Sequence, residues 1–179
     1  CGRESLRMAS EITLGLSYLH SLEPPIVHRD LKSMNVLVGE NYRMKLCDFG
    51  ESREAIAMSS HTLTLVGTPM WLAPEVISRR IYNITSDVYA LGIVLHEIVT
   101  AEDPFPATLF PTQILAAVLA GQRPVMLSWI RSDVKRLISL CLSEDPMLRP
   151  STLAIGAALA VMEDWDFVEK AGCRKHTHA

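Results

Sequence analysis

A short part of the sequence contains four polar residues whose side chains can align an anionic substrate and a hard cation. They are Asp30, Lys32, Asn35 and Asp48. A carboxylate such as Asp30 can accept and orient a hydroxyl proton, and the Lys32 ammonium can offset charge on a transferring group. Amide and carboxylate oxygens such as those of Asn35 and Asp48 are ligands that Mg²⁺ prefers. The set predicts phosphoryl transfer, which needs alignment and charge neutralisation more than covalent help.

A predicted β-hairpin brings these residues together. Residues 36–38 and 44–46 are short apolar segments, and Gly39-Glu40-Asn41 between them suits a turn. In an antiparallel hairpin, the residue that enters the first strand lies beside the residue that leaves the second, and paired strands are about 4.8 Å apart. We therefore expect Asn35 and Asp48 to reach one metal ion.

The rest of the chain predicts a mainly α-helical domain that carries this small hairpin. Apolar residues between positions 6 and 19 recur at steps of three and four, which is typical of one helix face. Residues 88–99 are apolar on every side, as in a helix at the centre of a core, and Thr85-Ser86-Asp87 suits its start. Residues 48–74 lack periodicity and predict a long functional loop. Further helices are expected at residues 112–120, 134–141 and 151–162.

The composition argues against several classes of protein. A net charge of −3 over 179 residues gives no basic surface for nucleic acid. The longest apolar run, residues 88–99, is too short and too polar to span a bilayer. The four cysteines form no CxxC pair, so a zinc site is not expected. We expect reduced thiols, a cytoplasmic location, no nucleic-acid partner and no membrane segment in this chain.

Three motifs in a fixed order resemble the protein kinase family. His28-Arg29-Asp30-Leu31-Lys32-Ser33-Met34-Asn35 is similar to the catalytic loop H-R-D-L-x-x-x-N, Asp48-Phe49-Gly50 to D-F-G, and Ala73-Pro74-Glu75 to A-P-E. Each triplet alone is weak, but the three in order with a hairpin between the first two are specific. The resemblance covers residues 5–163 and implies the large, C-terminal lobe of a kinase over residues 1–163, followed by a polar tail over residues 164–179.

The resemblance implies a catalytic or binding role for six residues. Asp30 would be the catalytic base, with Lys32 beside the phosphate that is transferred. Asn35 and Asp48 would hold Mg²⁺ on ATP. Leu37 matches the side chain that packs under adenine, and Thr68 matches the threonine that contacts the base and the lysine.

Further residues resemble the supporting parts of a kinase. Asp87 would hold the backbone of the catalytic loop, and Glu75 would pair with Arg149. His28 and Phe49 resemble members of the family's regulatory stack. An arginine beside the catalytic aspartate, here Arg29, can clamp a phosphate in the activation segment. The candidate phosphorylation sites are Thr64, which we prefer, and Thr62, Ser60 and Ser59.

The catalytic loop also indicates the acceptor. Lys32 and the segment Gly67-Thr68-Pro69 resemble serine/threonine kinases, and Met70-Trp71-Leu72-Ala73 resembles their tyrosine-kinase-like group. The resemblance thus implies transfer of the γ-phosphate of ATP to a Ser or Thr hydroxyl of a protein substrate.

The sequence contains no counterpart of the kinase small lobe. We find no glycine-rich loop of the form G-x-G-x-x-G and no V-A-I-K lysine, the two features that bind the phosphates of ATP in the family. We therefore expect the isolated chain to lack activity, to need the missing small lobe or a partner chain, and to expose an apolar surface where that lobe docks. The alternative function is a non-catalytic interaction module or a pseudokinase-like fragment. Asp30, Lys32, Asn35 and Asp48 are all present, which favours the enzyme.

Overall fold

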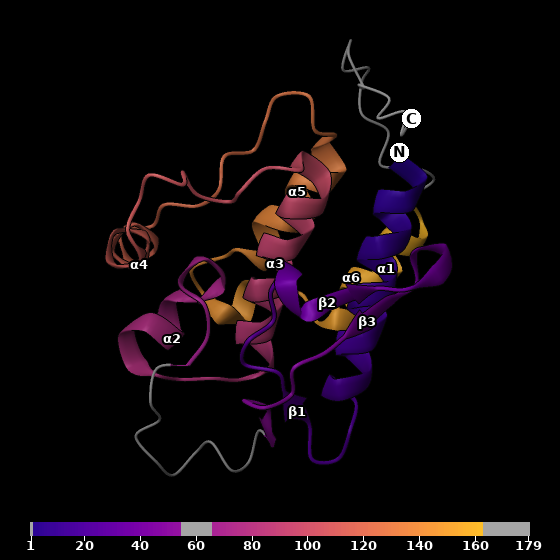
Figure 1. The fold of residues 1–179 in the computed structure, drawn as a ribbon, viewed down its shortest axis with the longest axis horizontal. Helices are drawn as coiled ribbons and strands as arrows, with labels where there is room; N and C mark the ends of the chain where they lie inside the picture. Colours follow the sequence, from indigo (N-terminus) through magenta and orange to yellow (C-terminus); the bar gives the residue numbers. More distant parts are fainter. Residues whose placement is uncertain (1, 55–65, 163–179) are drawn as a thin grey trace, which may run out of the picture.

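Helices dominate the computed structural model, which describes residues 2–54 and 66–162. α1 (Gly2–His20) packs against α6 (Thr152–Ala160) and α3 (Ile84–Thr100), and α3 also packs against α5 (Ser132–Cys141). Figure 1 shows α1 and α6 side by side, with α2 (Pro74–Arg79) and α4 (Pro111–Leu119) on the opposite side of the molecule. The mainly helical prediction is confirmed for the described residues.

Two small antiparallel sheets accompany the helices. β2 (Val36–Val38) pairs with β3 (Met44–Leu46), which confirms the predicted hairpin. β1 (Ile26–Val27) pairs with β4 (Arg53–Glu54), a contact that the sequence did not predict. Four 3₁₀ turns complete the described elements: η1 (Ser33–Asn35), η2 (Glu40–Tyr42), η4 (Pro69–Trp71) and η5 (Pro146–Leu148). No helix within residues 2–54 and 66–162 is long and apolar enough to cross a membrane.

Helix α3 forms the centre of the core, as its apolar sequence predicts. Every residue from Ser86 to His96 is buried. Gly92 allows α5 to approach closely, because a Cβ there would lie 2.7 Å from the Cβ of Cys141. Such a contact is shorter than packed atoms tolerate, so this position accepts only glycine without a shift of α5.

The expected start of α3 at Thr85 was one residue late, because the helix begins at Ile84 after Asn83. Asn83 caps the helix, since its side chain accepts a hydrogen bond from the Ser86 N–H at 2.9 Å while the Ser86 hydroxyl accepts one from the Asn83 N–H at 3.0 Å. This reciprocal pair is a capping box. Asp87 is therefore not needed as a cap, and its carboxylate makes other contacts.

Two other helices differ slightly from the expected ranges. α4 begins at Pro111 because proline suits the first helical position and the Gln113 side chain accepts the Phe110 N–H at 2.8 Å. Ser151 caps α6 as expected, accepting the Ala154 N–H at 3.2 Å, but the helix ends at Ala160.

The described parts of the segment predicted as one long loop over residues 48–74 contain short regular elements. β4 lies near its beginning, and η4 lies just before α2. Val66 is held at both backbone groups by Tyr82, whose hydroxyl accepts from the Val66 N–H at 2.6 Å and donates to the Val66 carbonyl at 2.7 Å. The candidate phosphorylation sites Ser59, Ser60, Thr62 and Thr64 lie outside the described residues.

Candidate active site

A buried carboxylate holds the backbone at the start of the site. The Oδ2 of Asp87 accepts the His28 N–H at 2.7 Å, and its Oδ1 accepts the Arg29 N–H at 3.0 Å. Arg29 has a φ of 71°, a left-handed conformation that non-glycine residues adopt only when their surroundings impose it. The Nε2 of His20 lies 3.0 Å from the same Oδ2. Two helices, α1 and α3, thus fix the turn that precedes Asp30.

Asp30, Lys32 and Thr68 form one hydrogen-bonded cluster. The Lys32 ammonium donates to Asp30 Oδ2 at 2.6 Å and to the Thr68 hydroxyl at 2.9 Å. Thr68 in turn donates to Asp30 Oδ1 at 3.1 Å. The structure therefore brings together three residues that are up to 38 positions apart in the sequence. Charge-assisted bonds of this kind orient the carboxylate strongly.

Asn35 connects this cluster to the hairpin. Its Nδ2 donates to the Asp30 carbonyl at 2.8 Å and to Asp30 Oδ2 at 3.2 Å. Its own carbonyl accepts the Cys47 N–H at 3.0 Å, which continues the β2–β3 ladder by one residue. The register thus places Asn35 beside Cys47, and the expected pairing with Asp48 was wrong by one position. Asp48 follows immediately with a φ of 61° and an exposed side chain.

The donor set at the hairpin fits Mg²⁺ on a phosphate substrate. Since the Nδ2 of Asn35 is engaged by Asp30, its amide oxygen is the atom left for a cation. The residues that the structure describes contain no cluster of three or more His, Cys, Asp or Glu side chains that would hold a metal alone. One carboxylate and one amide oxygen, completed by phosphate and water, is the arrangement that Mg²⁺ uses with nucleotides.

Several large apolar residues near Asn35 and Asp48 in the sequence are exposed. The exposed fractions of Met34, Leu37, Val38 and Phe49 are 63%, 55%, 61% and 47%. The Phe49 ring also contacts the His28 ring, with centroids 5.2 Å apart. A group of large apolar side chains at this exposure indicates a contact surface.

Arg29 contacts the segment that follows Asp48-Phe49-Gly50 and the ring of Tyr82. Its Nη1 donates to the Glu51 carbonyl at 3.2 Å, and its guanidinium lies 4.4 Å from the centre of the Tyr82 ring. The Arg29 Nε is buried and has no partner among residues 2–54 and 66–162. Tyr82, which Arg29 contacts, is also the residue that binds the backbone of Val66.

The comparison with known proteins agrees with this geometry. A family model described as the protein kinase domain matches residues 3–165. The chain belongs to the protein kinase family. This kinase chain is 45% identical to drkC of Dictyostelium discoideum, a probable serine/threonine-protein kinase, over 87% of the chain and 21% of the relative.

Two further relatives are similar at the same level. CTR1 of Arabidopsis thaliana, a serine/threonine-protein kinase, is 40% identical over 86% of the kinase chain and 19% of the relative. The dual specificity protein kinase shkC of Dictyostelium discoideum is 40% identical over 86% of the chain and 31% of the relative. The kinase chain thus spans a fifth to a third of the length of these relatives.

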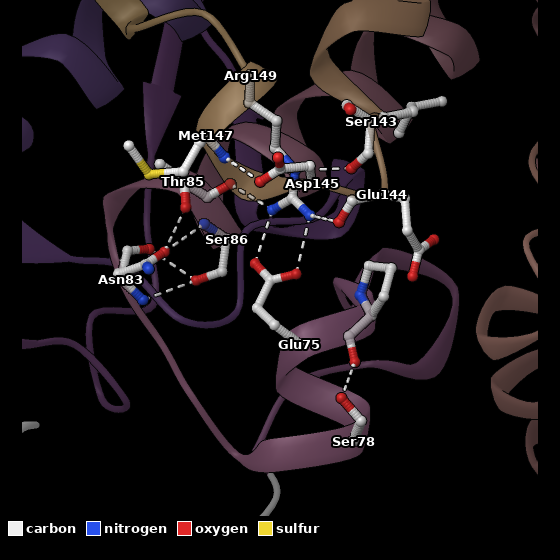
Figure 2. Close-up of polar contacts among 12 residues, drawn as sticks. Glu75, Ser78, Asn83, Thr85, Ser86, Ser143, Glu144, Asp145, Met147 and Arg149 are labelled. Carbon is white, nitrogen blue, oxygen red and sulfur yellow. Dashed lines mark hydrogen bonds and ion pairs between the residues drawn. The ribbon is translucent and has the colours of Figure 1, made fainter.

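A buried ion pair joins segments that lie near the candidate active site in the fold. The Arg149 guanidinium binds both oxygens of Glu75, at 2.6 and 2.8 Å, and donates to the carbonyls of Thr85 at 2.9 Å and Ser143 at 3.0 Å (Figure 2). The Arg149 side chain is fully buried. It therefore joins α2, which follows the site, to the start of α3 and to the segment after α5.

Glu97 is a site residue that the sequence analysis missed. Its Oε1 accepts the Ser33 hydroxyl at 2.9 Å, and its Oε2 accepts the Trp71 indole N–H at 3.0 Å. Glu97 thereby joins the catalytic loop of the kinase to η4. Burial raises its pKa above the usual range, although the bonds from Trp71 and Ser33 act in the opposite direction. The signal in the sequence was a carboxylate within the otherwise largely apolar run of residues 88–99.

We expect Glu97→Gln to change how the free energy of unfolding depends on pH. A raised pKa means that folded Glu97 holds its proton more tightly than the unfolded chain, whose ordinary value is 4.5. Its contribution to stability is therefore largest below that pH and is lost as the pH rises through the raised pKa. The stability of the wild type relative to Glu97→Gln should fall as the pH rises from about 4.5 through the raised pKa of Glu97. Urea unfolding of both proteins at several pH values measures this, and a constant difference would contradict it.

Proposed function

We propose that this chain is the large, C-terminal lobe of a serine/threonine protein kinase, which transfers the γ-phosphate of ATP to a Ser or Thr hydroxyl of a protein substrate. The observation that carries the proposal is the cluster of Asp30, Lys32 and Thr68, whose side chains lie within 3.1 Å of one another. A lysine in this loop and a threonine hydroxyl on the carboxylate fit a site for an aliphatic hydroxyl. The names of drkC and CTR1 support the same acceptor.

Each residue of the cluster has a distinct task in this proposal. Asp30 accepts a hydrogen bond from the substrate hydroxyl and orients it towards the phosphate. Lys32 offsets charge that develops on the transferring group, and Thr68 keeps the carboxylate in position. Asn35 and Asp48 would hold Mg²⁺, which when bound neutralises charge on the phosphates of ATP. Positioning and electrostatics supply the catalysis, because phosphoryl transfer needs no covalent intermediate with the protein.

Catalysis in this proposal takes place in a two-lobed assembly. The exposed apolar residues Met34, Leu37, Val38 and Phe49 contact a small lobe or a partner chain, which supplies the glycine-rich loop and the strand lysine. Leu37 lies under the adenine ring. We assign the lobe to residues 1–163 and a separate tail to residues 164–179, and we propose a cytoplasmic location. Trp71 and its neighbours place the chain in the tyrosine-kinase-like group.

Regulation by phosphorylation is part of the proposal. Arg29 has a buried Nε without a partner among the described residues, and it lies against Tyr82, which holds Val66. A phosphate on Thr64, or on Thr62, Ser60 or Ser59, would supply acceptor oxygens for this arginine.

The proposed function is tested by phosphate transfer from labelled ATP to a mixture of Ser- and Thr-containing proteins. The chain is assayed alone and fused behind a kinase small lobe, each also with Asp48→Ala. We expect no transfer from the chain alone, transfer from the fusion to Ser and Thr, and loss of transfer in Asp48→Ala. Asp48 is exposed, so this substitution should leave the fold intact. A folded fusion that binds protein partners but neither binds ATP nor transfers phosphate would instead indicate a non-catalytic interaction module.

A further inference from the structure

Helix α3 holds the catalytic loop with two carboxylates. Asp87, near the start of the helix, accepts the two backbone N–H groups that come just before Asp30. Glu97 lies ten residues later, which is about 15 Å further along the helix, and accepts the hydroxyl of Ser33 at 2.9 Å. Ser33 directly follows Lys32. The helix therefore binds the loop both before Asp30 and after Lys32.

The second oxygen of Glu97 holds the segment that carries Thr68. The Glu97 Oε2 accepts the indole N–H of Trp71 at 3.0 Å, and Trp71 is only 7% exposed. The backbone N–H of Trp71 donates to the Thr68 carbonyl at 3.0 Å and closes the turn η4. One side chain thus joins the residue after Lys32 to the turn that begins at Thr68.

The charge of Glu97 does not serve the stability of the lobe at neutral pH. Burial raises the pKa of Glu97, although Trp71 and Ser33 both donate hydrogen bonds to it. The folded protein therefore disfavours the ionised form relative to the neutral one. Since the charge brings no stability here, the contribution of Glu97 lies in the geometry of the two segments that it joins.

We propose that Glu97 is a positioning residue of the transfer site. It fixes the catalytic loop relative to the segment that begins at Thr68, and so sets the place where Asp30 orients the acceptor hydroxyl. The inference rests on the proposed function, because it concerns the same site. A misplacement of about 1 Å at such a site costs roughly 10²-fold in rate.

The first test is Glu97→Met, assayed in the full chain fused behind a kinase small lobe. Methionine has nearly the length of glutamate but cannot replace the two carboxylate oxygens, so the bonds to Ser33 and Trp71 are both lost. We expect kcat for phosphate transfer to fall by about 10²-fold. The KM for ATP should change little, because Asn35 and Asp48 are the residues proposed to hold Mg²⁺ on the nucleotide.

Glu97→Gln should restore the rate. The indole of Trp71 only donates, and the amide oxygen of glutamine can accept from it. A hydroxyl both donates and accepts, so Ser33 can accept from the glutamine NH₂ group. Both contacts are then kept without the charge, and kcat should stay close to that of the wild type. A Glu97→Gln variant as slow as Glu97→Met overturns the proposal.

Two controls separate positioning from a general effect on the fold. Val99→Ala leaves a cavity in the same helix, where Val99 is buried and its hydrocarbon side chain has no donor or acceptor. It should lower the free energy of unfolding in urea but leave kcat unchanged. Glu102→Met makes the same substitution at an exposed carboxylate and should change neither. A loss of kcat in Val99→Ala equal to that in Glu97→Met overturns the positioning role.

Ser33→Ala tests whether Glu97 acts through the catalytic loop. It removes one of the two contacts, so kcat should fall part of the way, and the change should add little to Glu97→Met. Losses that multiply in the double variant overturn the proposal, as does a Glu97→Met variant with the kcat of the wild type. A wild-type fusion that transfers no phosphate contradicts the proposed function itself, and this inference falls with it.

Discussion

Replacing Asp30 by asparagine is expected to lower kcat for phosphate transfer by roughly 10²–10⁴-fold, the range that a positioned general base contributes. Asparagine has nearly the same shape, so Thr68 can still donate to its amide oxygen. The negative charge is lost, however, and with it the partner of Lys32 at 2.6 Å and the group that accepts the substrate proton. The KM for ATP should change little, since Asp30 acts on the hydroxyl and not on the nucleotide.

The assay compares the wild type and Asp30→Asn as fusions behind a kinase small lobe. Glu40→Gln is a suitable control, because it also converts a carboxylate to an amide, but in the exposed turn of the hairpin. Urea unfolding of all three proteins checks that the fold is intact. A kcat for Asp30→Asn within about threefold of the wild type would remove Asp30 from the role of base, given that the smallest expected loss is about 10²-fold.

Replacing Arg149 by methionine should lower the free energy of unfolding by about 3–5 kcal/mol, the usual cost of breaking a buried ion pair from one side. The substitution leaves the Glu75 carboxylate without its two bonds, and it removes the donors to the carbonyls of Thr85 and Ser143. Since α2 and the start of α3 are joined through this side chain, the loss should affect the whole lobe. Urea unfolding at neutral pH provides the measurement.

Arg7→Met is the control for this experiment. Arg7 also pairs with a glutamate, Glu11, but its side chain is 47% exposed and the atoms are 3.3 Å apart, so the expected cost is at most about 1 kcal/mol. The double variant Glu75→Gln with Arg149→Met should be less destabilised than the sum of the single changes, because each single change leaves one buried charge unpaired and the double variant leaves none. Equal costs for Arg149→Met and Arg7→Met would show that burial of the pair has no energetic consequence.

The predictable parts of the molecule are those whose signal lies in consecutive residues. The hairpin could be predicted because two apolar segments flank a turn. Helix α3 could be predicted because a helix that is apolar on every side must be buried in the core. The cluster of Asp30, Lys32 and Thr68 was expected from the resemblance to kinases, since nothing in the spacing of Thr68 relates it to Asp30.

The missed parts depend on contacts between distant residues. The pairing of β1 with β4 was missed because β4 has only two residues, too few to show a period, and its partner Ile26 is distant in the sequence. The cap at Asn83 was missed because Ser86 and Asp87 are equally good capping residue types. Only the structure shows that the Asp87 carboxylate binds the His28 backbone instead of capping the helix. Glu97 was missed because its partners come from two other segments.

The packing of the first helix against the last has a consequence during protein synthesis. The apolar face of α1, which includes Ile12 and Leu16, is translated early, whereas α6, which covers part of it, is translated more than 130 residues later. At 5–20 residues per second, this interval lasts roughly 7–28 s. Ribosome-bound chains that stop before α6 should therefore present α1 to chaperones, and a truncation that removes α6 should reduce the yield of soluble protein.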